Sequence, residues 1–169
     1  MKDKIALITF TLILLIGNHN TSYGQQSYIT VEQTQGLEFG SIIPGTSDGT
    51  VTIGTNNQVT PVNVALLSIL PRHRAEFKLQ FHLRGIDLFE NVKSITVQPS
   101  TILNRVGGGG SMQVTGLTQY GALNWYMGYF HNVPHPNYIY FNVGGTLHVK
   151  STTPEGEYTG TYTVTITHD

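Results

Sequence analysis

The chain contains no cysteine among its 169 residues. This absence excludes disulfide bonds, zinc sites built on thiolates and catalysis by a cysteine nucleophile. Charged residues are also scarce, at 11% of the chain against about 25% in ordinary globular domains. The formal net charge is −1 and no run of Lys or Arg occurs. The sequence therefore lacks the basic surface that nucleic-acid binding requires.

The N-terminus has the pattern of a secretory signal peptide. Lys2 and Lys4 precede an apolar run over residues 5–16, and polar residues follow that run. Ser22 and Gly24 then supply the small side chains that signal peptidase requires before its cleavage site. The sequence therefore predicts export to the periplasm, the cell surface or the extracellular medium.

Cleavage at this site divides the chain into two parts. We expect residues 1–24 to be a cleavable signal-peptide helix and residues 25–169 to form a single domain. An uncleaved membrane anchor is the alternative, but the apolar run is shorter than the ~20 residues that a membrane-spanning helix needs. No membrane span is expected after cleavage.

Apolar and polar residues alternate with period two over most of the predicted domain. The clearest case is a set of four apolar residues that alternate with polar ones, Phe77, Leu79, Phe81 and Leu83. A strand would place these four side chains on one face, whereas a helix would scatter them. Similar alternation predicts strands in the segments 28–31, 51–53, 62–66, 95–97, 112–114, 138–140, 147–149 and 158–166.

These short strands are separated by turn residues, and no helical periodicity accompanies them. The pattern predicts an all-β fold, an immunoglobulin-like antiparallel β-sandwich whose interior includes Phe77, Phe81 and Tyr162. The four glycines at 107–110 are expected at the tip of a long hairpin. Gly144 and Gly145 are expected at a hairpin turn or a bulge.

Two motifs rich in glycine and proline lie near the ends of the predicted domain, and each alternates with strand residues. Their residues are best explained as determinants of the fold, because glycine permits tight turns and close backbone approach while proline suits a strand end. The structural residues of these motifs are Phe39, Gly40, Pro44, Gly45, Gly49, Gly156, Tyr158 and Gly160. We expect the ring of Tyr158 to face inward with its hydroxyl near the backbone.

These two motifs resemble the secreted bacterial family described as domain of unknown function 4402. The resemblance implies an immunoglobulin-like sandwich, distantly similar to the spore-coat-U type of pilin and coat proteins. It therefore implies a structural role at the cell surface, and it brings neither catalytic residues nor cofactors. The segment from about residue 72 to 142 carries no part of the resemblance.

Aromatic residues crowd into the segment 120–141. Tyrosine and tryptophan faces beside asparagine amides can stack on and hydrogen-bond a sugar, as in many ligand sites. The candidate ligand-binding residues are Trp125, Tyr126, Tyr129, Asn137 and Tyr138. Packing of these rings in the core is the alternative, since alternation along a strand exposes at most half of them.

Catalytic constellations are weak. His131 and His135 are candidate metal ligands, but neighbouring prolines prevent a regular helix that would bring them together, so exposed loop histidines are the simpler interpretation. Glu155 and Glu157 lie on one turn instead of facing each other across a cleft, as glycoside hydrolysis requires. No enzyme activity, metal or cofactor is predicted.

The sequence favours a structural, pilin-like or surface-assembly role, with other surface proteins or glycans as partners. A carbohydrate-binding or adhesive module that uses the segment 120–141 is the alternative. Polymerisation by strand exchange would need an apolar extension before the first strand. Only Gln25–Ser27 precede the strand at Tyr28 after cleavage, so a spare donor strand is missing.

Overall fold

The computed structural model describes residues 5–7, 28–82, 89–121, 126–128 and 138–168. These residues form strands joined by turns, and no helix occurs among them. The strands are β1 (Ile5–Leu7), β2 (Tyr28–Gln35), β3 (Glu38–Pro44), β4 (Gly49–Ile53), β5 (Val59–Val62), β6 (Val64–Leu67), β7 (Ala75–His82), β8 (Phe89–Val97), β9 (Ser100–Arg105), β10 (Ser111–Gly121), β11 (Tyr126–Gly128), β12 (Tyr138–Val149), β13 (Glu157–Thr159) and β14 (Val164–His168).

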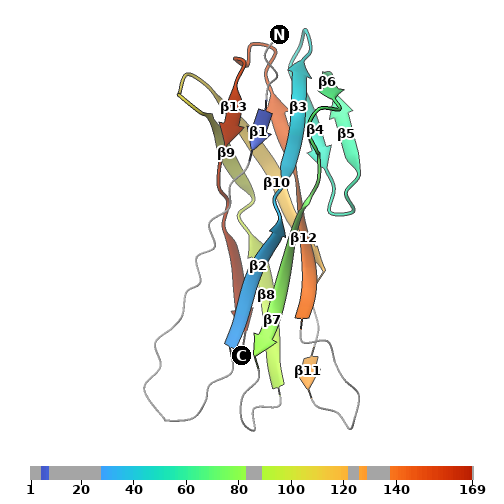
Figure 1. Ribbon diagram of the computed structural model, residues 1–169, viewed down its shortest axis with the longest axis vertical. Coiled ribbons are helices and arrows are strands. Elements are labelled where there is room, and N and C mark those ends of the chain that lie inside the picture. The colour runs from blue at the N-terminus through green and yellow to red at the C-terminus, as the bar shows by residue number, and fades with distance from the viewer. Residues whose placement is uncertain (1–4, 8–27, 83–88, 122–125, 129–137, 169) are drawn as a thin grey trace.

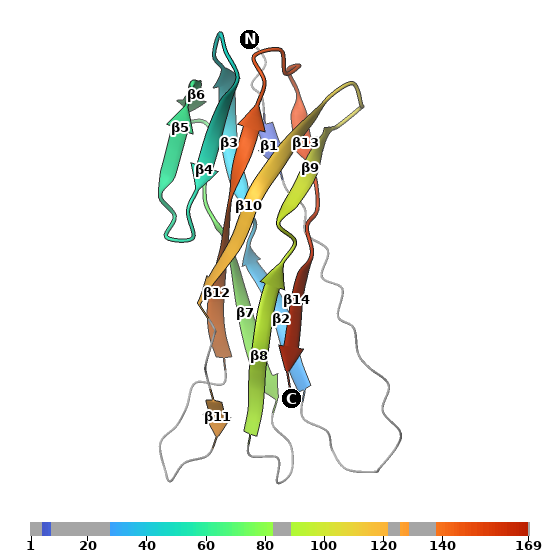
Figure 2. The ribbon, with the colours of Figure 1, turned by 180° about the vertical axis from the view of Figure 1, so that it is seen from behind.

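The strands form two sheets that face each other. The larger sheet has the order β2-β7-β12-β10-β9-β13-β1-β3-β6, and β4 joins it by pairing with β12 and with β5. The smaller sheet has the order β11-β8-β14. Figure 1 shows β2 and β7 of the larger sheet nearest the viewer in the lower half of the molecule. Figure 2, the opposite view, shows β8 and β14 of the smaller sheet nearest the viewer. The predicted all-β sandwich is confirmed.

Among the connections that the structure describes, two pass from one sheet to the other. The smaller sheet's β8 continues past Pro99 into β9 of the larger sheet, and β13 of the larger sheet leads into β14 of the smaller one. Strands that switch sheets in this way close the corners of a sandwich. The predicted single strand 158–166 is therefore two strands in different sheets.

Alternation explains how the core forms. In β7 the side chains of Ala75, Phe77, Leu79 and Phe81 are buried, while the polar residues between them are half-buried on the outer face. The rings of Phe77 and Phe141, register partners on β7 and β12, stack with their centroids 4.8 Å apart. Tyr162 is also buried. The predicted interior of Phe77, Phe81 and Tyr162 is confirmed.

The glycines expected at turns have two different roles. Gly107–Gly110 join β9 to β10 in a hairpin, as predicted, with Asn104 paired to Ser111. Gly144 and Gly145 instead lie within the continuous strand β12, so the hairpin alternative is wrong, whereas the bulge alternative agrees with the register shift between Thr115 and Thr118 of β10. A Cβ on Gly144 would lie 2.4 Å from the carbonyl oxygen of Ile53. These glycines let neighbouring chain segments approach closely, and the register shift lies opposite them in β10.

The structure describes only a small part of the predicted signal peptide. Within residues 1–24 the structure describes only Ile5–Leu7, and these three residues form the strand β1 instead of part of a helix. The remainder of the leader lies outside the described residues. Figure 1 shows β1 in the upper half of the molecule, between β13 and β3.

Candidate functional site

Exposed aromatic rings gather on the outer face of the larger sheet. Because side chains alternate along a strand, the residues between the buried positions of β2, β7 and β12 all point to this face. We call five of them the aromatic face. They are Tyr28 from β2, Lys78 and His82 from β7, and Tyr138 and Tyr140 from β12.

Contacts between neighbouring side chains fix the arrangement of the aromatic face. Tyr28 stacks on His82, its register partner, with a centroid separation of 4.4 Å. Tyr138 and Tyr140 meet edge to face at 5.6 Å, and the Nζ atom of Lys78 lies 5.0 Å from the centre of the Tyr138 ring. All three tyrosines expose more than two fifths of their surface. The face therefore offers rings, a cation and hydroxyl groups to solvent on a rigid support.

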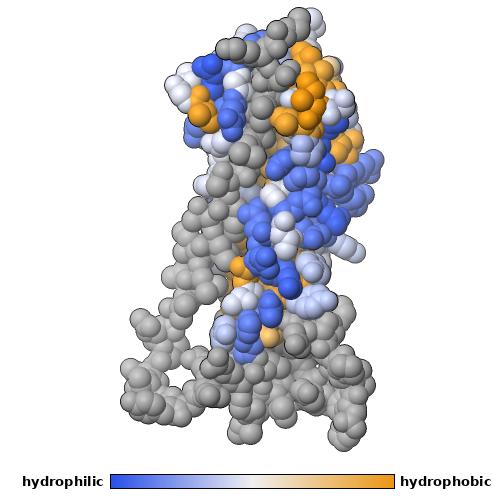
Figure 3. Space-filling view, in the orientation of Figure 1, coloured by the Kyte–Doolittle hydropathy of each residue, from blue (hydrophilic) through white to orange (hydrophobic). Residues whose placement is uncertain are grey.

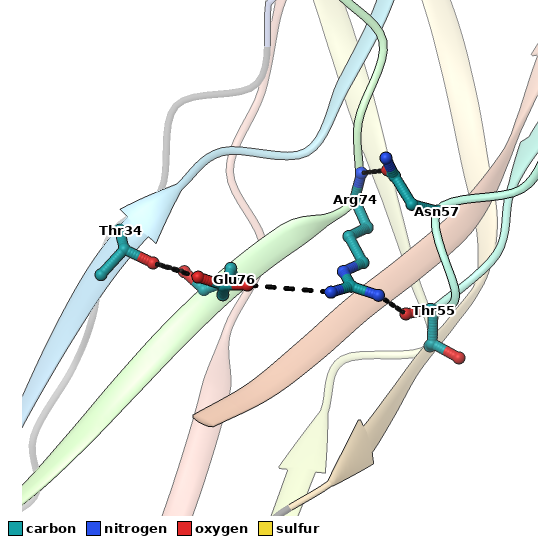
Figure 4. A network of polar contacts seen from close by, with 5 residues as sticks. All are labelled: Thr34, Thr55, Asn57, Arg74 and Glu76. Carbon is teal, nitrogen blue, oxygen red and sulfur yellow. Dashed lines mark hydrogen bonds and ion pairs between the residues drawn. The ribbon is translucent and has the colours of Figure 1, made fainter. Parts of the chain in front are cut away.

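A polar network lies on the same strands near the start of β7 (Figure 4). The carboxylate of Glu76 accepts a hydrogen bond from the Thr34 hydroxyl at 3.2 Å and lies 3.8 Å from the guanidinium of Arg74. Arg74 donates to the carbonyl oxygen of Thr55 at 2.7 Å, and its backbone N–H donates to the Asn57 side chain at 2.8 Å. The network joins β2 and β7 to the hairpin between β4 and β5. The charged groups of Arg74 and Glu76 therefore stabilise this contact between the strands and the hairpin.

The predicted ligand-binding residues are described only in part. Tyr138 is on the aromatic face. Tyr126 lies in β11, where only its backbone is described, and Trp125, Tyr129 and Asn137 lie outside the described residues. The sequence suggested His82 only as a possible third metal ligand, and it included neither Tyr28 nor His82 among the residues that could bind a sugar. The available signal was their position, since each alternates with buried residues in a strand, but pairing the two requires the β2–β7 register.

The candidate catalytic and metal residues do not converge. His131 and His135 lie outside the described residues. In the part of the chain that the structure describes, no group of three His, Asp or Glu side chains could hold a metal ion. Glu155 and Glu157 are exposed beside the turn before β13.

A shallow hollow on the outer side of β12 includes Asp48 and His148. Both side chains already have local partners. The Asp48 carboxylate accepts from the backbone N–H of Ser151 at 2.9 Å, and His148 is hydrogen-bonded to the Thr115 hydroxyl at 2.7 Å. The polar groups of the hollow therefore stabilise the local structure, and Asp48 and His148 are not arranged as a pair for proton transfer.

The residues of the first structural motif occupy strand ends and close contacts. Phe39 is fully buried, and Gly40 has a φ of +72°, in the region that favours glycine. Pro44 is the last residue of β3. A Cβ on Gly45 or on Gly49 would lie 2.4 Å from a backbone carbonyl oxygen of the neighbouring chain segment.

The second motif has the same character. The ring of Tyr158 is fully buried, and its hydroxyl donates to the carbonyl oxygen of Pro154 at 2.7 Å. Gly156 has a φ of +152°, and a Cβ there would lie 2.5 Å from Nε of Arg105. At Gly160 a Cβ would lie 2.5 Å from the carbonyl oxygen of Ile102.

Two buried tyrosines have shifted ionisation. Burial raises the pKa of Tyr158, and the Arg105 guanidinium opposes part of that rise. Burial alone raises the pKa of Tyr162 far above its ordinary value. Both hydroxyls therefore keep their protons to a higher pH than an exposed tyrosine does.

Within the described ranges, no helix is long and apolar enough to cross a membrane.

Comparison with known proteins identifies one family. The family model described as domain of unknown function (DUF4402) matches residues 29–168. No curated protein and no solved structure matches the chain significantly. The family match extends over β2 to β14, including the middle of the chain where the sequence motifs showed no resemblance. The chain therefore belongs to the DUF4402 family.

Proposed function

We propose that this chain is an exported protein of the cell surface with a structural, pilin-like or surface-assembly role and no catalytic activity. Its location is the periplasm, the cell surface or the extracellular medium. Its partners are other surface or extracellular proteins.

One observation carries this proposal. The strand position between β3 and β13 is filled by β1, whose residues Ile5–Leu7 belong to the predicted leader. Removal of residues 1–24 would leave β3 and β13 as facing edges without a strand between them. Unpaired edges accept strands from other chains. A sandwich that leaves export with such a gap is suited to assembly.

The surface chemistry supports the same role. Arg74, Glu76 and Asp48 form local bonds, and Glu155 is exposed on a turn. The chain also stabilises its core without cysteine, through buried residues contributed by both sheets. Such a domain needs no disulfide bond, so the absence of cysteine is compatible with an extracellular location.

Export is tested by expressing the full chain with its own N-terminus in a Gram-negative host. We expect the periplasmic or culture fraction to contain a chain that begins at Gln25. The variant Gly24→Arg is the matched control, because a long charged side chain before the cleavage site blocks processing. Size-exclusion chromatography of the purified exported chain then tests assembly. Retention of the wild-type chain in the cytoplasm would contradict the proposal.

The aromatic face favours carbohydrate binding as a second candidate function. Exposed rings at fixed spacing, flanked by Lys78 and the polar side chains of β7, match the mixed apolar and polar lining of sugar sites. A glycan array with the exported chain tests this candidate. Tyr138→Ala should abolish binding, whereas Ile102→Ala, at an exposed position on β9, should not. Absence of binding by the wild-type chain would remove this candidate and leave the assembly role standing.

A further inference from the structure

We call the strand position between β3 and β13, which β1 fills, the slot. The strand in the slot has a defined register with both neighbours. Ile5 pairs with Glu157 and Ala6 with Tyr158 in a parallel ladder on one side. On the other side Ile5 pairs with Ser41 and Ala6 with Gly40 in an antiparallel ladder. β1 thus joins β3 to β13, and the other edge of each is already occupied, β13 by β9 and β3 by β6.

Backbone geometry shows which groups face the slot. The carbonyl oxygen of Glu157 accepts a hydrogen bond from the Val106 N–H at 2.8 Å, so it points toward β9. Backbone groups of successive strand residues point to opposite edges. The N–H and C=O groups of Tyr158 therefore point toward β1, and an empty slot would leave them without a strand partner.

An empty slot would also expose part of the core. Phe39 on β3 and Tyr158 on β13 flank the slot and are fully buried in the structure that includes β1. With strands spaced about 4.8 Å apart, removing β1 leaves β3 and β13 about 10 Å apart. That gap takes one extended chain and no more.

We infer that, in the exported protein, this slot binds an extended apolar segment of a different exported polypeptide, which runs parallel to β13 and antiparallel to β3. The inference rests on the proposed assembly role and specifies how assembly occurs. Residues 5–7 (Ile-Ala-Leu) indicate the chemistry of the occupant, an uncharged strand rich in aliphatic side chains.

A second copy of the mature chain fits the slot poorly. The residues that would precede its first strand are Gln25–Ser27, which are polar. Three residues span only about 10 Å when extended, and they must also leave the donor domain. A separate polypeptide with an apolar strand meets the requirement. Occupation by the chain's own residues 5–7, if the leader is retained, is the competing arrangement.

The absence of cysteine permits a clean cross-linking test. The probe is a synthetic peptide with the sequence of residues 3–10, a lysine tail for solubility and cysteine at the position of Ile5. It is mixed with the exported chain carrying Glu157→Cys, with oxidised glutathione as the oxidant, after mass spectrometry has confirmed that the chain begins at Gln25. Neighbouring strands place register partners within the range that a disulfide can bridge.

Two controls isolate the slot. Glu155→Cys places a thiol on the exposed turn before β13, two residues before the position that pairs with Ile5. A peptide with proline at the position of Ala6 lacks a backbone donor in the middle of the strand. We expect disulfide formation at least tenfold faster with Glu157→Cys than with Glu155→Cys, and a similar loss with the proline peptide. The cysteine-free peptide should raise the melting temperature of the wild-type exported chain.

Each other outcome overturns a defined statement. Equal cross-linking at the two positions in a correctly exported chain would overturn the slot inference and leave the proposed function intact. An exported chain that retains residues 5–7, with a position-5 cysteine that cross-links to Glu157→Cys internally, would assign the slot to the chain itself and overturn the inference. A chain that stays in the cytoplasm would overturn the proposed function as well. If the exported chain aggregates alone, rescue by the peptide and not by its proline variant would support the inference, and no rescue would overturn it.

Discussion

The hydroxyl of Tyr158 donates a 2.7 Å hydrogen bond to the carbonyl oxygen of Pro154. This bond closes the turn before β13 and holds a fully buried ring beside the slot in which β1 lies. The same side chain thus serves both the core and the edge at which we propose a partner binds.

Removing this hydroxyl should weaken the fold. Tyr158→Phe removes the donor and leaves the carbonyl oxygen of Pro154 without this hydrogen bond, and we expect the free energy of unfolding to fall by about 1 kcal/mol. Urea denaturation followed by circular dichroism measures the change. Tyr120→Phe is the control, because Tyr120 is 72% exposed. Equal stability of the Tyr158→Phe variant and the wild type would show that the bond contributes nothing.

Gly40 should not tolerate a side chain. Its φ is +72°, and a Cβ would lie 2.6 Å from Cγ of Arg72 and 3.1 Å from the carbonyl oxygen of Pro71. Gly40→Ala therefore combines backbone strain with a clash, and we expect a loss of about 2 kcal/mol or more in unfolding free energy.

Gly116→Ala provides the matched control for Gly40→Ala, because Gly116 has a φ of +60° with nothing within 4 Å of a Cβ. It should show the strain alone, about 1 kcal/mol. Thermal denaturation of the two variants side by side separates the two contributions. The same loss for both would mean that Arg72 and the backbone at Pro71 move aside freely.

The stacked rings of Phe77 and Phe141, on β7 and β12, should contribute much of the core's stability. Phe77→Ala removes a fully buried ring whose centroid lies 4.8 Å from that of Phe141. We expect the free energy of unfolding to fall by about 3–5 kcal/mol, as is typical when a core phenylalanine is truncated to alanine. Ile102→Ala, at a residue that is 56% exposed, should cost far less. Denaturant titration measures both. A small effect at Phe77 would contradict the assignment of the core.

Stability should fall in alkaline solution. Burial raises the pKa of Tyr162 well above its ordinary value of 10.0. The folded chain therefore keeps this proton where the unfolded chain has lost it, so stability is fully present below pH 10 and declines as the pH rises beyond it. Tyr162→Phe should flatten the decline between pH 10 and pH 12, measured by urea midpoints at each pH. An unchanged slope in the variant would assign the alkaline loss to other groups.

Local alternation was enough to predict β7 and the buried positions of Phe77 and Phe81, because a period of two reports directly on a half-buried strand. It was not enough for Gly144 and Gly145. A glycine pair is equally compatible with a hairpin turn and with a position within a strand where a neighbouring chain segment approaches closely. Only the pairing of β12 with β4 and β10 decides between these alternatives.

The candidate site shows the same limit. Tyr138 was predictable from its aromatic neighbourhood, but Tyr28 and His82 are 54 positions apart and meet only through the β2–β7 register. The apolar run at residues 5–16 also does not predict a strand, because its length and flanking residues are those of a signal peptide. The parallel pairing of β1 with β13 depends on contacts between the two ends of the chain, which no local pattern reports.

The most direct test of the account is the intact mass of the exported chain. Export with cleavage predicts a chain that begins at Gln25 and therefore lacks β1. The same sample, analysed by hydrogen exchange, should then show faster exchange at Tyr158 than at the amides of β9. A mass that includes residues 1–24, together with slow exchange at Tyr158, would contradict the claim that export leaves the sheet incomplete.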